Sequence, residues 1–99
     1  MAATKDDIER WFDEAKLNGA THLIIVCDTF DYEDFPVHVK KVEDFWTTYN
    51  LYNKPENMTR IMEVFDMNAP KDEQMAGRAW NCPPKEDPVY GEKANSQSL

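Results

Sequence analysis

The stretch HLIIVCDTFDYEDFPVHV, residues 22–39, decides the fold of this 99-residue chain. Leu23 to Cys27 are apolar without interruption, and an acidic, aromatic turn separates them from a second apolar stretch that is rich in valine. A continuous apolar run of this length that ends in turn residues is typical of a strand buried on both faces. The sequence therefore predicts a hairpin with its first strand over residues 21–29 and its second over residues 35–41.

The second strand is expected at an edge of the sheet. Its residues alternate, which places Phe35, Val37 and Val39 on one face. Pro36 lies on the other face and has no N–H to donate to a neighbouring strand, so it is confined to an edge strand or to the start of a strand. The first strand should accordingly be the more central of the two.

A helix is predicted before the hairpin, over residues 4–18. Thr4 is a suitable N-cap, and Asp7 follows at the position that completes a capping box. The next apolar residues recur at the spacing of one helix face: Ile8, Trp11, Phe12 and Ala15. Gly19 supplies the left-handed conformation that ends many helices.

Three further elements are predicted after the hairpin. Aromatic residues at helical spacing indicate a helix over residues 42–53, and Pro70 with acidic residues behind it indicates a short helix over residues 70–79. Residues 58–67 fit a helix or a strand, and a strand is favoured because a helix begins directly after them. The prediction is an α+β domain over residues 1–80, in the order α-β-β-α-β-α, with a small antiparallel or mixed three-stranded sheet. Residues 81–99 are predicted to be an extended, Pro-rich tail whose last eight or so residues are disordered.

Composition narrows the range of partners. Nineteen acidic against eleven basic residues give a net charge of −8, which disfavours binding to nucleic-acid backbones and to anionic membranes. The N-terminal MAATKDDIERW is charged where a signal peptide is apolar, and no stretch approaches the roughly 20 apolar residues of a membrane span. Two cysteines are too few for a disulfide framework, and Cys27 is expected to be a small buried hydrophobe. These features predict a cytosolic protein.

Catalytic patterns are weak in this sequence. Four carboxylates, Asp28, Asp31, Glu33 and Asp34, crowd one turn, but their spacing is not that of a calcium loop and no glycine lies among them. His22 and His38 lie at the outer ends of the predicted hairpin, where they could meet and bind a metal together with a carboxylate. Phosphate-binding glycine loops and serine-nucleophile motifs are absent from the sequence. No catalytic residue, metal site or cofactor is therefore predicted.

Binding residues are better represented. Arg78 and Trp80 lie two residues apart after the last predicted helix, Arg60 begins the third strand, and Tyr49 is one of several aromatics in the second helix. An arginine beside an aromatic ring suits a nucleotide, because the guanidinium binds phosphate and the ring stacks on a base. These four residues are the predicted ligand site. The alternative is that Trp80 fills the core and Arg78 only complements the C-terminus of a helix.

The predicted first strand also suggests self-association. If the helices cover one face of a three-stranded sheet, the apolar side chains on the other face of residues 23–27 are exposed. Large apolar patches are rare on monomers of this size, so a symmetric homo-oligomer based on a dimer is expected. The alternative is that the third helix or the tail covers this face.

Three segments carry a resemblance to known proteins: residues 22–37, residues 57–66 (NMTRIMEVFD) and residues 74–80. They resemble small bacteriophage and prophage proteins that share a GATHLIIVCDTFDYEDFPV-type stretch, and the resemblance covers most of residues 6–80. The resemblance implies a phage setting and assigns no site residues.

The resulting expectation is a non-catalytic phage accessory protein that counters host defence in the host cytoplasm. It would sequester a small cyclic or ADP-ribose-type nucleotide signal at a homo-oligomer interface, by analogy with the small sponge proteins that phages encode. The alternative is an acidic inhibitor that mimics nucleic acid and blocks a host defence protein; a metal-dependent phosphodiesterase ranks third. A mimic should carry its acids along one face, whereas the basic residues here are mixed through the chain. Direct binding to nucleic acid or to a membrane is not expected.

Overall fold

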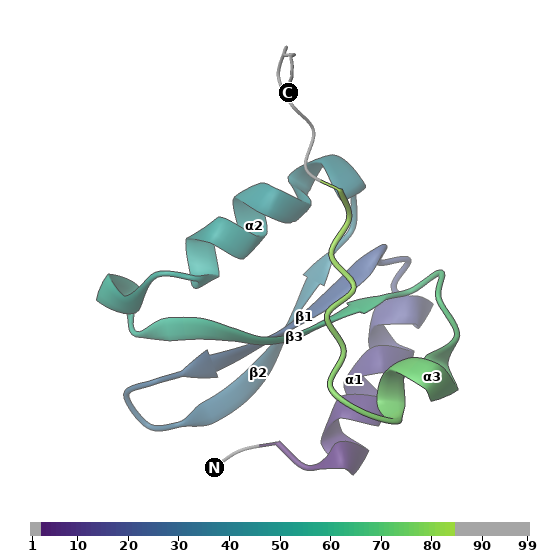
Figure 1. The fold of residues 1–99 in the computed structure, drawn as a ribbon, viewed down its shortest axis with the longest axis horizontal. Helices are drawn as coiled ribbons and strands as arrows, with labels where there is room; N and C mark the ends of the chain where they lie inside the picture. Colours follow the sequence, from purple (N-terminus) through teal and green to yellow (C-terminus); the bar gives the residue numbers. More distant parts are fainter. Residues whose placement is uncertain (1–2, 85–99) are drawn as a thin grey trace, which may run out of the picture.

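The predicted hairpin supplies two strands of a three-stranded sheet, with its first strand in the middle and its second at an edge, and the sheet lies between helices on its two faces (Figure 1). The computed structural model describes residues 3–84. The strands are β1 (His22–Asp28), β2 (Glu33–Val39) and β3 (Thr59–Asp66), and both β2 and β3 pair antiparallel with β1. The predicted α+β class and element order are confirmed, as are the central position of β1 and the strand over most of residues 58–67.

The helices follow the local signals in the sequence. Helix α1 (Lys5–Leu17) begins with a capping box, in which the Thr4 hydroxyl accepts from the Asp7 N–H and the Asp7 carboxylate accepts from the Thr4 N–H. A 3-10 turn, η1 (Val42–Asp44), leads into α2 (Phe45–Tyr52), and a second, η2 (Pro55–Asn57), leads into β3. Helix α3 (Lys71–Met75) ends at Met75 rather than at residue 79, because the residues that follow it run along β3 instead.

Both faces of β1 are buried within one chain. Leu23 and Ile25 pack against α1 with Phe12 and Phe65, whereas Ile24 and Val26 pack on the α2 side. The expectation of an exposed apolar face on this strand is therefore wrong. Three strands span about 10 Å, close to the diameter of one helix, so a single helix is enough to cover each face.

The first residues of the predicted tail pack against the domain. Asn81 and Cys82 were predicted to belong to the tail, but Asn81 pairs with β3 and Cys82 packs on the α2-side core. Residues 85–99, and with them the predicted disorder of the C-terminus, lie outside the described residues. Among the residues that are described, no helix has the length and apolarity needed to cross a membrane.

Candidate functional site

The candidate site is built on the outer edge of β3, which residues 78–81 cover. The Val64 N–H donates to the Ala79 carbonyl at 3.0 Å, and the Asn81 N–H donates to the Val64 carbonyl at 2.9 Å. Trp80 therefore lies beside Val64 in a short parallel bridge. Because backbone hydrogen bonds hold the residues on either side of it, the position of Trp80 is set by the sheet.

Two side chains complete the covering of this edge. The Gln74 amide accepts from the Asp66 N–H and donates to the Asp66 carbonyl, both at 2.8 Å, as a paired strand residue would do. At the other end Arg78 Nε donates to the Met62 carbonyl at 2.9 Å. Residues 62, 64 and 66 thus all find partners on the edge that faces away from β1. An edge covered in this way resists pairing with another chain.

Met62 is also the extra residue of a β-bulge. The register between β1 and β3 shifts between Ile25, which is opposite Glu63, and Val26, which is opposite Ile61. The carbonyl that Arg78 binds belongs to the bulged residue, and bulges commonly redirect groups at a sheet edge. The bulge therefore presents the Met62 carbonyl, and the hydrogen bond from Nε to this carbonyl holds the Arg78 side chain at the edge of the sheet.

Three of the four predicted ligand residues come together on this edge. The Arg78 guanidinium carbon lies 5.5 Å from the centre of the Trp80 ring, and the Tyr49 ring meets Trp80 edge-on with centres 6.1 Å apart. Arg78 and Trp80 line an open hollow of about 340 Å³. Trp80 is 48% exposed, so it does not fill the core, and Arg78 lies beyond the end of α3. The geometry therefore favours the surface pair over the alternative structural roles.

Arg60 is separated from the other three residues. It is opposite Cys27 in the sheet, and Cys27 lies on the face opposite Val26 and Tyr49. Its guanidinium interacts with the Cys27 thiol, which also has Asp34 as a neighbour. The prediction that Arg60 shares the site is wrong, because the alternation of β3 turns its side chain to the other face.

Two titratable groups near the hollow, Tyr49 and Cys82, have raised pKa values. Burial, and to a smaller extent Cys82, raise the pKa of Tyr49, so this phenol keeps its proton. Burial also raises the pKa of the Cys82 thiol, which makes it a poor nucleophile, and it does the same to the Cys27 thiol on the other face of the sheet. The groups around the hollow can therefore donate hydrogen bonds and stack on a ligand.

The two histidines do not meet. His22 is buried, and its ring packs edge-on against Phe45 on the α2 side of the sheet. His38 is opposite Leu23, whose side chain lies on the α1 side, so the histidines project from opposite faces. The expected approach of the pair across the hairpin is wrong. Within residues 3–84, no three His, Cys, Asp or Glu side chains lie close enough together to hold a metal ion.

Sequence reasoning missed Gln74 and Asn81, which position the site. Gln74 is buried, and its Oε1 also accepts from Asn81 Nδ2 at 2.6 Å. The only local signal for Gln74 is a polar residue on the inner face of a short helix.

Comparison of this chain with family models, curated proteins and solved structures finds no match.

Proposed function

We propose that this chain is a non-catalytic binding protein that takes up a small nucleotide on the surface formed by Arg78, Trp80 and Tyr49. The observation that carries the proposal is the exposed guanidinium–indole pair, which backbone and side-chain hydrogen bonds hold against the edge of β3. A pair held in this way loses little side-chain entropy when a ligand binds.

Each group has a defined task in the proposed complex. Arg78 is anchored through Nε, and among the described residues its terminal nitrogens have no hydrogen-bond partner, so both can donate to a phosphate. The indole of Trp80 offers a face on which a base can stack. Glu73 lines an adjoining hollow of about 270 Å³ with Arg78 and Trp80. This carboxylate and the net charge of −8 both disfavour the approach of an anion from a distance. The affinity for a nucleotide must therefore come from short-range contacts.

The proposed complex also includes a second copy of the chain. The described residues leave the hollow beside Trp80 open, whereas nucleotide sites bury most of their ligand. A homo-oligomer whose copies meet through the side chains around this hollow, without strand pairing, would enclose the nucleotide, and a dimer is the simplest such assembly. In the phage setting that the sequence resemblance implies, the ligand is a cyclic or ADP-ribose-type signal of host defence, and the role of the protein in the host cytoplasm is to sequester it.

Calorimetry with the full chain tests the proposal, using a panel of cyclic dinucleotides, cyclic trinucleotides and ADP-ribose. Loss of stacking costs about 1–3 kcal/mol, so Trp80→Ala should weaken binding roughly 5- to 150-fold. Arg78→Met should also weaken it, and Arg60→Met is the matched control because that arginine lies on the other face. Equal affinities for Arg78→Met and Arg60→Met, or no binding by any nucleotide of the panel, would refute the site.

Two further measurements separate the parts of the proposal. Light scattering after size-exclusion chromatography should show a dimer or a multiple of it, at least when the nucleotide is bound; a monomer with and without ligand would remove the interface. Incubation of the same panel with Mg²⁺ or Mn²⁺ should leave every nucleotide intact. Hydrolysis would contradict a non-catalytic role and support the phosphodiesterase.

A further inference from the structure

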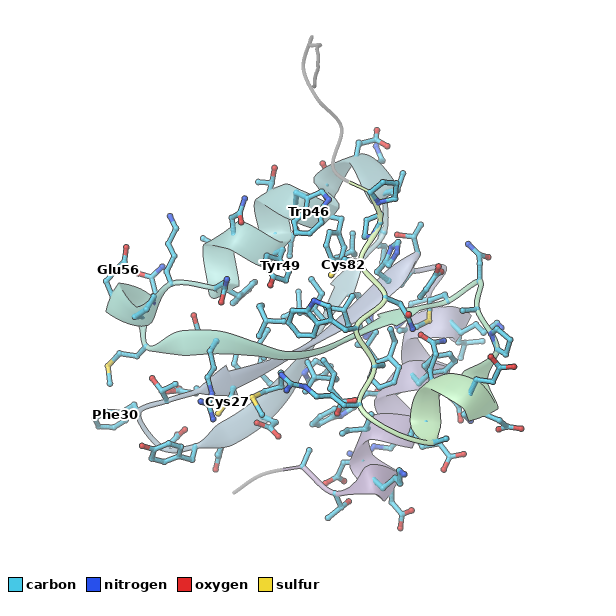
Figure 2. All side chains as sticks on the ribbon, viewed as in Figure 1. Cys27, Phe30, Trp46, Tyr49, Glu56 and Cys82 are labelled. Atoms are coloured by element: carbon cyan, nitrogen blue, oxygen red, sulfur yellow. The ribbon has the colours of Figure 1, made fainter. Side chains whose placement is uncertain are left out.

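Three exposed apolar side chains gather at the end of the sheet that is far from α1 and α3. Phe30 is 76% exposed, Tyr32 is 63% exposed and Met58 is 44% exposed. Figure 2 shows Phe30 at the tip of the hairpin and Glu56 at the same end of the molecule, on the turn that precedes β3. We call residues 28–34 together with residues 56–58 the hairpin tip. Surface aromatics that cluster in this way mark interaction sites more often than isolated ones do.

The hairpin tip is a built structure. The Thr29 N–H donates to the Met58 carbonyl at 2.8 Å, which joins the two turns. Within the hairpin, the Phe30 N–H donates to the Asp28 carboxylate at 2.9 Å, and the Tyr32 N–H donates to the Asp28 carbonyl at 2.7 Å. The three apolar side chains are therefore presented from a fixed platform.

Two of these side chains occupy backbone positions that suit glycine. Tyr32 has φ of 60° and Met58 has φ of 57°, and they are the two non-glycine residues with positive φ in the described part of the chain. A side chain in the left-handed region costs conformational energy that glycine avoids. Since neither side chain is buried, folding does not require them, and they can be removed without damage to the core.

The charges around the tip decide what can bind it. Asp31, Glu33 and Glu56 are exposed, and Asp28 and Asp34 are half-buried. The tip itself has no basic side chain, and the nearby Arg60, which lies opposite Cys27 with Asp34 as a further neighbour, offsets only part of this charge. The ion pairs among the described residues involve α1 and Lys71, and none of them includes a carboxylate of the tip. A second copy of this tip, an anionic membrane and a nucleic acid would all be repelled by this charge. The complementary surface is cationic.

We propose that the hairpin tip is a docking surface for another protein, one that presents an apolar recess bordered by lysine and arginine. Phe30 and Tyr32 would enter the recess, and the surrounding carboxylates would pair with the basic rim. Buried aromatics inside a charged, more polar border are the usual anatomy of such interfaces. The tip lies away from the Arg78–Trp80 surface, so the proposal does not depend on nucleotide binding.

The test uses the ¹⁵N-labelled full chain and three synthetic peptides of equal length. The first alternates pairs of lysine with pairs of leucine, the second replaces leucine by serine, and the third replaces lysine by glutamate. The Lys/Leu peptide should shift the amide resonances of residues 28–34 and 56–59 in a saturable way. The other two peptides should bind at least tenfold more weakly. Shifts that spread over the acidic face of α1 instead, or equal binding of the Lys/Ser peptide, would overturn the proposal.

Variants make the test independent of folding. Tyr32→Gly relieves the left-handed backbone and should keep or raise the melting temperature while it weakens binding of the Lys/Leu peptide at least fivefold. Phe30→Ser should weaken it similarly. Leu17→Ser is the matched control, because Leu17 is 87% exposed on the same surface as Asp13 and Glu14 of α1. Unchanged affinity in Tyr32→Gly and Phe30→Ser, or an equal loss in Leu17→Ser, would refute the hairpin tip as the docking surface.

A last measurement needs no peptide. If the resonances of the tip broaden as the concentration of the protein alone is raised, a second copy of the chain is the occupant, and the proposal is refuted.

Discussion

Replacement of Gln74 by alanine should loosen the edge of the sheet that carries the candidate site. The Gln74 side chain takes part in two hydrogen bonds with Asp66 at 2.8 Å each, one with Asn81 at 2.6 Å and a longer one with the Ala69 carbonyl at 3.3 Å. A hydrogen bond contributes about 1 kcal/mol net, and a buried partner left unpaired costs about 1–3 kcal/mol more. Because Asp66 is half-buried, water can replace part of the loss. We expect Gln74→Ala to lower the free energy of unfolding by about 2–4 kcal/mol.

Urea unfolding followed by circular dichroism measures this loss. Hydrogen exchange at the Asn81 amide, which pairs with Val64, should rise more than exchange at the centre of β1. Glu73→Gln is the matched control, since Glu73 is its exposed neighbour in α3, and it should change stability by less than about 0.5 kcal/mol. A Gln74→Ala loss as small as that of the control would refute the idea that this amide holds the edge.

Gln74→Glu separates the donor from the acceptor role. A carboxylate still accepts from the Asp66 N–H and from Asn81, but it cannot donate to the Asp66 and Ala69 carbonyls. We expect a loss at neutral pH at least as large as that of Gln74→Ala, because a charge replaces a neutral amide in a buried position. Stability equal to wild type at pH 7 would show that the two donated hydrogen bonds contribute nothing.

Two further outcomes test the local chemistry of the fold. Thr4→Ala removes the N-cap of α1 and should cost about 1 kcal/mol in urea unfolding, whereas a loss below about 0.3 kcal/mol would mean that the capping box is not used in solution. Burial lowers the pKa of His22 below its ordinary 6.5, although Asp66 partly offsets this, so the unfolded chain binds the proton more readily. The contribution of His22 to stability is therefore complete above pH 6.5 and is lost as the pH falls below it, and His22→Phe should flatten the pH dependence of the urea midpoint below pH 6.5; equal slopes in the two proteins would contradict a buried, neutral His22.

The sequence by itself determined which elements form and in what order. Apolar periodicity is local, so the run from Leu23 to Cys27 and the Thr4 capping box identify a central strand and a helix start without knowledge of their neighbours. Pro36 likewise places its strand at an edge, because a missing N–H is a property of one residue. The proximity of Arg78 to Trp80 was also within reach, since the two are separated by one residue.

The tertiary structure alone decided which surfaces are covered and which side chains meet. Sheet order and strand register decide three of these features. One helix covers each face of β1, Arg60 faces away from Tyr49, and His22 and His38 project to opposite sides. The pairing of residues 79–81 with Val64, and the role of Gln74 beside it, require that β3 be an edge strand with an unpaired side. These contacts depend on which strands are neighbours and on how they are aligned, and both are settled only when the strands pair and bury a common face.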